Sequence, residues 1–314
     1  MHKETKRTNR INGHRIGVFA ILCLFGFCLT AQIIPEKKTQ RAKSKVYLLH
    51  SNVLKKIKEH PDAQVLVGEV VFRHDSIYMY CDSACFYEKT NSLEAFDHVK
   101  MVQGDTLFLY GDYLFYDGNT QIAQVRNNVR MENRTTTLLT DSLNYDRVAN
   151  LGYYFDGGSL MDEENILTSD WGEYSPATKQ SVFNYDVKLE NPQFTLVSDT
   201  LRYNTATKIA NIVGPSDIDN KENHIYSELG FYNTQTGQAE LLNRSVLTNE
   251  GKRLVGDSLF YDRNKNYGEA FVNVEMTDTV NKNMLTGNYC FYDELTGYAF
   301  ATDRALAVDY SQGD

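Results

Sequence analysis

Carboxylates recur along this chain at a nearly fixed spacing, and a regular line of carboxylates is a candidate calcium site. Asp112, Asp141, Asp170, Asp199 and Asp257 each stand four residues before a tyrosine. Repeat proteins that bind calcium through such a line carry a Gly-Gly-x-Gly-x-Asp spacing, which this sequence lacks. We therefore expect each carboxylate to accept backbone hydrogen bonds where the chain turns. The sequence predicts no metal site and no cofactor.

No other group of residues has a spacing suited to catalysis. The stretch from Asp217 to Glu222 resembles the start of a calcium-binding loop but lacks the required glycine and terminal glutamate. No histidine has a nucleophile or a second metal ligand at a suitable spacing, and there is no Gly-x-Ser-x-Gly motif or glycine-rich phosphate loop. The chain is therefore predicted not to be an enzyme.

The acidic residues belong to a sequence repeat that tyrosines mark. Seven of the tyrosines follow one another at intervals of 29 residues, and the last interval is 31. They are Tyr87, Tyr116, Tyr145, Tyr174, Tyr203, Tyr232, Tyr261 and Tyr292. A period of this length indicates one supersecondary unit that is copied and stacked. Such a stack offers a long continuous surface or groove rather than one catalytic pocket.

A second position of the repeat is leucine in four units, two residues before the tyrosine. Because side chains alternate along a strand, a Leu-x-Tyr segment places both side chains on one face. The residue between them is polar in several units, as at Asn144, Glu173 and Arg202, and is predicted to face water. The predicted apolar inner ladder consists of Leu114, Tyr116, Leu143, Tyr145, Leu201, Tyr203, Leu259 and Tyr261.

Each unit is predicted to read strand, corner, strand, turn, strand. A leucine seven residues before the tyrosine, as at Leu109, has the wrong parity for one flat strand, so we expect a corner or bulge at pairs such as Gly111-Asp112. Polar runs after the tyrosine predict turns. The fold class is all-β, an elongated, repeat-built jellyroll or solenoid-like stack. A leucine-rich repeat is excluded by its missing signature, and a closed parallel β-helix remains an alternative.

Three cysteines, Cys81, Cys85 and Cys290, lie within the repeated part of the sequence. Cys85 and Cys290 fall at the leucine position, where a free cysteine packs as a small apolar residue. In this first unit, Tyr80 and Ser83 fall at the positions of the other leucine and the acid. A disulfide between Cys81 and Cys85 is an alternative in an oxidising compartment.

The N-terminus reads as a secretory signal. Basic residues precede an apolar run from Ile16 to Ala31, which is too short to span a bilayer. We predict a signal peptide over residues 1–31 and a basic leader over 32–45. A domain built of repeated units is predicted over 46–314. A lipid anchor at Cys28 and an uncleaved anchor are the alternatives.

Charge limits the partners. The chain has 32 basic and 41 acidic residues. Without residues 1–31 it keeps 27 basic and 40 acidic residues, so no nucleic acid is expected to bind. Any bound lipid must be held mainly through its apolar part.

The repeated units resemble the OstA/LptA-like family of lipopolysaccharide transport. The resemblance rests on segments such as Thr140–Asp146 and Gly256–Asp262, which read Thr/Gly-Asp-Ser-Leu-x-Tyr-Asp, and extends from about Val46 to the end. It implies a periplasmic β-jellyroll with an apolar interior that shelters lipopolysaccharide acyl chains, in contact with other Lpt-type export components and close to the outer membrane. The rival hypothesis is a structural or adhesive β-solenoid whose core is filled by its own side chains and whose outer face binds protein.

The last residues suggest an open strand edge. Ser311–Asp314 repeats the pattern of Val102–Asp105, after which another unit follows. An unpaired edge is a template for pairing with another chain. We therefore expect end-to-end self-association, or a continuation of the repeat beyond residue 314.

Overall fold

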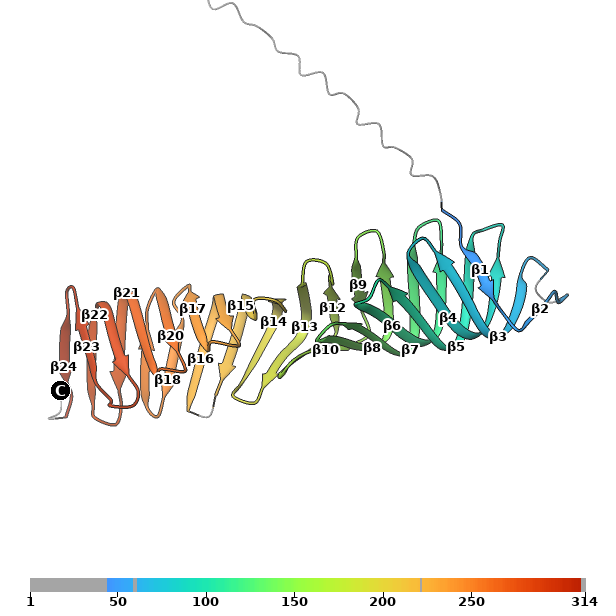
Figure 1. Cartoon of the computed structure of the whole chain (residues 1–314). Helices are drawn as coiled ribbons and strands as arrows, with labels where there is room; N and C mark the ends of the chain where they lie inside the picture. The colour runs from blue at the N-terminus through green and yellow to red at the C-terminus, as the bar shows by residue number, and fades with distance from the viewer. Residues whose placement is uncertain (1–43, 59–60, 221, 312–314) are drawn as a thin grey trace, which may run out of the picture. The chain divides into compact units, whose positions relative to one another are not determined.

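The computed structural model describes residues 44–58, 61–220 and 222–311. The described residues belong to one compact unit, and the predicted signal peptide and most of the basic leader lie outside them. No helix among the described residues is long and apolar enough to cross a membrane. The structure of the described part is built from strands (Figure 1).

The described residues form twenty-four strands that pair into one antiparallel sheet, and the predicted all-β stack is confirmed. Their bounds are β1 (Tyr47–His50), β2 (Val53–Lys55), β3 (Gln64–His74), β4 (Ile77–Tyr87), β5 (Ser92–Gln103), β6 (Leu107–Asp117), β7 (Ile122–Asn133), β8 (Thr136–Asp146), β9 (Leu151–Tyr154), β10 (Gly158–Asp162), β11 (Asn165–Ser169), β12 (Trp171–Tyr174), β13 (Gln180–Asn191), β14 (Phe194–Asn204), β15 (Ile209–Asp219), β16 (Asn223–Asn233), β17 (Gln238–Leu242), β18 (Val246–Asn249), β19 (Lys252–Val255), β20 (Ser258–Asp262), β21 (Tyr267–Asp278), β22 (Asn283–Asp293), β23 (Ala299–Thr302) and β24 (Leu306–Asp309). Neighbouring strands pair antiparallel, as β6 does with β7 and β14 with β15. The alternative of a parallel β-helix is therefore wrong.

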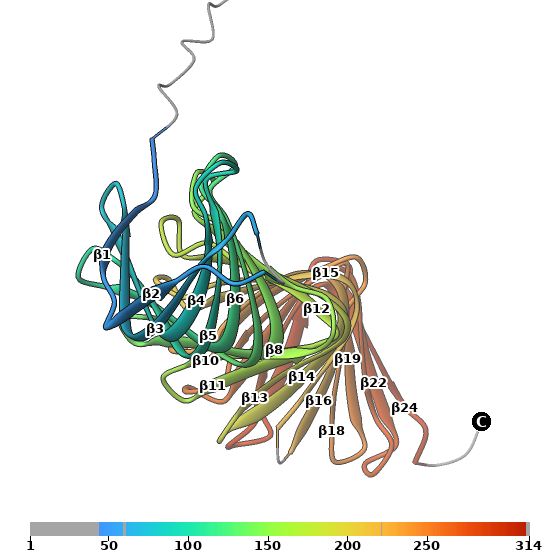
Figure 2. The same cartoon turned by 90° about the vertical axis from the view of Figure 1, so that its right-hand side faces the viewer.

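Each long strand bends in its middle, where the corner was predicted. The register of β6 against β7 shifts between Tyr110 and Tyr113, at the Gly111-Asp112 pair. The facing strand carries the conformational change, because Asn127 and Asn128 both have left-handed backbone angles, with φ of 62° and 52°. The two halves of the bent strands form two walls that face each other (Figure 2). A bulge of this kind changes the parity of a strand, which explains the odd offset between the two leucine positions.

The strands are joined by two kinds of turn. Short turns at the ends of one wall include those between β3 and β4 and between β10 and β11. Long turns at the ends of the other wall directly follow the tyrosines, and their last residue has a positive φ, as in Asn150, Lys179 and Lys208. Backbone bonds connect successive long turns: the Thr234 N–H donates to the Lys208 carbonyl at 2.9 Å. The stack is thus held together at its turns as well as by its strands.

The first unit is offset by one residue from the predicted repeat. The inward-facing residues of β4 include Met79, Ala84 and Phe86, whereas Tyr80 is 39% exposed and Cys85 is half-buried. The prediction that Tyr80, Cys85 and Tyr87 belong to the inner positions is therefore wrong. The physical reason is that the first residues of β4 and β6 are 30 residues apart, whereas the tyrosines are 29 apart. Both strands begin directly after a short turn, so the inward positions of β4 are shifted by one residue.

The cysteines follow from this register. Cys81, Cys85 and Cys290 are free, so the alternative of a Cys81–Cys85 disulfide is wrong. Cys81 faces the interior, where burial raises the pKa of its thiol to about 12. Cys290 is fully buried at the leucine position, as the repeat predicted.

The two walls enclose one apolar core that extends from Val46 to Tyr292. A small residue seven positions after the tyrosine recurs for a reason visible in the pairing. Ala123 lies directly opposite Tyr116, Gly152 opposite Tyr145, and Ala210 opposite Tyr203. Cross-strand partners are in close contact, so a small partner leaves space for the ring.

Candidate functional site: an apolar interior closed by a polar seam

The predicted inner ladder is buried along its whole length. All eight of its residues lie in the apolar core, and none is more than 3% exposed. The polar residues between the leucines and tyrosines lie on the opposite face, and Arg202 is exposed. The parity argument therefore placed these residues on the correct face. Whether this face receives a ligand is a separate question.

A tyrosine is suited to its position because its two ends meet different surroundings. The ring packs among apolar side chains, and the hydroxyl reaches the line where the short turns meet the long turns. We call this line the seam. A buried tyrosine hydroxyl needs a hydrogen-bond partner, and the seam supplies one to each inner tyrosine from Tyr116 to Tyr292.

At the first part of the seam the partners are neutral groups and one arginine. The Tyr116 hydroxyl lies 2.6 Å from Nδ1 of His74 and accepts from the Arg147 guanidinium at 3.1 Å. Tyr145 donates to Oδ1 of Asn150 at 3.2 Å. Gln103, from a short turn, donates to the same Asn150 oxygen at 3.0 Å and so connects the two sets of turns.

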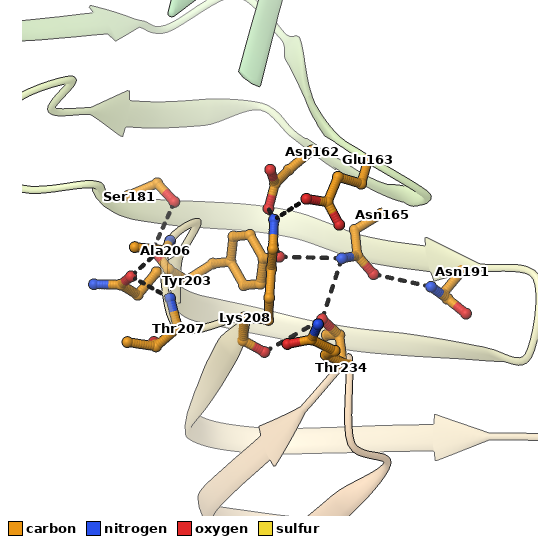
Figure 3. A network of polar contacts seen from close by, with 12 residues as sticks. Asp162, Glu163, Asn165, Ser181, Asn191, Tyr203, Ala206, Thr207, Lys208 and Thr234 are labelled. Carbon is orange, nitrogen blue, oxygen red and sulfur yellow. Dashed lines mark hydrogen bonds and ion pairs between the residues drawn. The ribbon is translucent and has the colours of Figure 1, made fainter. Parts of the chain in front are cut away.

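In the middle of the chain the seam contains a buried ion pair (Figure 3). Lys208 Nζ lies 2.8 Å from Oδ2 of Asp162, and the Tyr203 hydroxyl donates to the same oxygen at 2.8 Å. Asn165 donates to the Tyr203 hydroxyl and to Thr234 Oγ1, both at 3.1 Å. Since Asp162 is fully buried and Lys208 nearly so, this network is the most strongly polar part of the interior. We call it the clasp.

Further along, each tyrosine again has its own partner. Arg263 donates to the Tyr232 hydroxyl at 2.8 Å, and Lys252 donates to that of Tyr292 at 3.0 Å. Asn223 donates to the Tyr261 hydroxyl at 2.8 Å. The seam is therefore closed by hydrogen bonds from one end of the stack to the other, without a covalent link among the described residues.

Burial controls the protonation of these groups. It raises the pKa of the hydroxyls of Tyr145, Tyr232 and Tyr261 to about 12. Tyr203 also has a raised pKa, first because of burial and then because of the Asp162 carboxylate. His74 behaves in the opposite sense, since burial lowers the pKa of its imidazole. These four tyrosines are thus neutral hydrogen-bonding groups over the physiological range.

The seam partners were missed by the sequence analysis, although a signal was present. His74, Gln103, Asn133 and Asp162 stand 41 or 42 residues before the tyrosine that each one contacts. This offset joins units that are not adjacent in sequence, so a comparison of aligned positions within one unit does not detect it.

Two of the five carboxylates before the tyrosines, Asp112 and Asp257, have a structural role that differs from the prediction. The side chains that donate to them come from the opposite bulge: Asn128 donates to Asp112 at 2.6 Å and Asn273 to Asp257 at 2.7 Å. The predicted backbone donors are replaced by amide side chains because the left-handed bulge residues lie across the corner. Among the described residues, no three His, Cys, Asp or Glu side chains are grouped so that they could hold a metal ion.

The fold and the seam define a class of protein: an antiparallel stack of repeats with an apolar interior that is closed by a hydrogen-bonded seam. The family described as OstA-like protein matches residues 43–199 and again 193–250. These matches span more than half of the chain, so the chain belongs to the OstA-like protein family, as the resemblance predicted.

LptH from Pseudomonas aeruginosa, described as the LptA homologous periplasmic component of the conserved lipopolysaccharide transport device, is 13% identical; the match covers 47% of this chain and 98% of that one, with a TM-score of 0.24. No curated protein matches the chain.

Proposed function

We propose that this protein is a periplasmic, non-enzymatic carrier in lipopolysaccharide transport that shelters acyl chains between its two walls. Membership of the OstA-like protein family supports this proposal. The acyl chains would lie against the inner ladder, which includes Leu114, Leu143 and Leu259. The partners would be lipopolysaccharide and other export components, with a location close to the outer membrane. Association of copies through their strand edges belongs to the same proposal.

One observation carries the proposal: a continuous apolar ladder is closed at the seam by non-covalent contacts, most of them single hydrogen bonds. A hydrogen bond contributes about 0.5–1.5 kcal/mol to stability, and burial of one methylene group contributes about 0.8 kcal/mol. An acyl chain of a dozen carbons can therefore offset the loss of several seam bonds. Lateral entry of a lipid needs the seam to part, and its bonds are weak enough to allow this.

The rival function is a structural scaffold that binds protein on its outer face. The burial of the ladder favours it, since the leucines and tyrosines are at most 3% exposed and already fill the space between the walls. Under this hypothesis the seam stays closed and the interior has only a structural role.

Photo-crosslinking in cells distinguishes the two functions. A photoreactive residue at Leu114, which is fully buried, faces the interior, and the same residue at the neighbouring Phe115 faces outward. Lipopolysaccharide attached at position 114 and not at 115 is the expected result. Protein adducts at 115, with no lipid at either position, would overturn the carrier function in favour of the scaffold.

A further inference from the structure

One column of interior side chains changes in size along the stack. An inward-facing residue stands nine positions after each inner aromatic residue, and its size changes systematically from unit to unit. In chain order these residues are Ala95, Val125, Tyr154, Phe183, Ile212, Leu241 and Ala270, each at most 1% exposed. The column is therefore small at both ends and aromatic in the middle.

Tyr154 fills the centre of the interior. An added Cβ at Gly172 would lie 2.5 Å from the Tyr154 hydroxyl oxygen, and one at Gly158 would lie 2.7 Å from its ring. Contacts this short exclude any side chain at either glycine. Gly172 occupies the position that is leucine in four other units because Tyr154 already takes the volume.

Hydrogen bonds hold Tyr154 in this place. Its hydroxyl lies 2.7 Å from Oγ of Ser169, which in turn donates to the Trp171 carbonyl at 2.7 Å. Gly172 of β12 pairs with Phe183 of β13, and Phe183 pairs with Leu201 of β14. Tyr154 of β9 and Phe183 of β13 thus lie on the two strands that flank β12, both directly opposite Gly172. We call these two aromatic residues the plug.

The plug and the clasp are built on the same strands. β10 carries Gly158 under the Tyr154 ring at one end and Asp162 at the other, and β11 carries both Asn165 and Ser169. Lys208 and Tyr203 meet Asp162 at the seam beside this position. At one place along the stack the interior is therefore filled by aromatic rings while the mouth is held by a buried ion pair.

We infer that the plug and the clasp divide the interior into two separate acyl-binding compartments. One lies on the side of Leu114 and the small residue Ala95, the other on the side of Leu259 and the small residue Ala270. This inference rests on the proposed carrier function and refines it: Leu201 and Tyr203, predicted as part of the lipid lining, belong to the partition instead.

The physical reason is the different cost of opening the seam at different places. Parting the walls beside Ala95 or Ala270 breaks hydrogen bonds such as those of Tyr116 and Tyr261, and the ion pairs of these stretches each have one partly or fully exposed partner. Parting them at the clasp separates Asp162 from Lys208 and leaves a buried charge without its partner, which is strongly unfavourable. Acyl chains therefore enter on either side and do not pass the middle while the clasp is formed.

The test uses the full secreted chain, purified lipid A as the probe, and a photoreactive residue at one of three positions. The expected result is crosslinking at Leu114 and at Leu259, none at Phe183, and about two probe molecules per chain at saturation. Crosslinking at all three positions would overturn the partition and leave the carrier function intact. Crosslinking at none of them would overturn the carrier function and this inference with it.

A plug variant gives a second, independent readout. In Tyr154→Ala the volume beside Gly158 and Gly172 becomes free, and lipid crosslinking at Phe183 is expected to appear. Tyr145→Ala is the matched control, since it removes a ladder tyrosine outside the plug and should leave position 183 without lipid. Circular dichroism verifies that both variants are folded; if Tyr154→Ala is not, the wild-type crosslinking profile alone decides. Folded Tyr154→Ala without lipid at 183 would contradict the plug.

Discussion

Two stretches of the seam use the same tyrosine position in different ways. At Tyr145 the hydroxyl donates to the amide oxygens of Asn150 and Gln103 at 3.2 and 3.4 Å. At Tyr203 it donates to a buried carboxylate that is paired with a lysine. The two rings are equally buried, at 0% exposure, so the difference lies in the polar partners. Asp162 takes the place of Gln103 at the short turn, and Lys208 takes the place of Asn150 at the long turn. A change at two positions of the repeat, one in each kind of turn, thus converts a seam of neutral hydrogen bonds into one that contains an ion pair.

The strongest expected difference concerns Lys208. Replacement by methionine, Lys208→Met, leaves the buried Asp162 carboxylate without its cation and should lower the free energy of unfolding by about 3–5 kcal/mol. Urea unfolding followed by circular dichroism measures it. The control Lys188→Met, at a half-exposed pair with Glu190, should change it by about 0–1 kcal/mol. The double variant Asp162→Leu/Lys208→Met should recover most of the loss; if it does not, packing rather than charge explains the single variant.

Truncating a ladder leucine should cost a similar amount of unfolding free energy in the Tyr145 stretch and in the Tyr203 stretch. Leu143→Ala and Leu201→Ala each remove a fully buried side chain and should each lower the free energy of unfolding by about 2–5 kcal/mol. Leu139→Ala, at a residue that is 37% exposed on the same strand as Leu143, is the control and should have a clearly smaller effect. A large difference between Leu143→Ala and Leu201→Ala would show that the core, and not only the seam, differs between the stretches.

The hydroxyl groups themselves give a smaller effect of the same direction. Tyr203→Phe leaves Asp162 and Asn165 each without one partner and should cost about 1–3 kcal/mol, because unsatisfied buried polar groups are penalised. Tyr145→Phe removes longer bonds to neutral amides and should cost about 0.5–1.5 kcal/mol. Thermal unfolding of both variants under the same conditions measures the order, and equal losses would contradict the comparison made above.

The smallest effect is a dependence on pH at the first part of the seam. His74 is enclosed by Tyr116, Ser44, Asp75 and Arg147, and burial lowers its pKa from the ordinary value of 6.5. The folded protein therefore binds this proton less readily than the unfolded chain. The stabilising contribution is present above pH 6.5 and is lost as the pH falls below it.

The measurement compares unfolding midpoints in urea at pH values on either side of this window for the wild type and His74→Gln. Glutamine can hydrogen-bond without titrating, so the variant should lose less stability on acidification than the wild type. Equal losses in the two proteins would show that His74 does not contribute to the pH dependence.

The prediction from sequence was most successful for features that depend on the residues of a single strand. The repeat, the all-β fold and the corner at Gly111-Asp112 follow from alternation along a strand, which is a local property. The inner positions of Leu114, Tyr145 and Leu259 follow in the same way. The first unit failed because Tyr87 has the correct residue type but stands one residue away from the inward position, which Phe86 takes.

The sequence by itself therefore determined which residues of the ladder face inward, since the strand period of two residues fixes a face once the period is recognised. Only the tertiary structure decided which groups the tyrosine hydroxyls bind. His74 and Tyr116, or Asp162 and Tyr203, are brought together because the short and long turns of different units meet at the seam. Contacts between positions some 40 residues apart depend on how the walls bend and stack, and no local pattern of residues specifies that geometry.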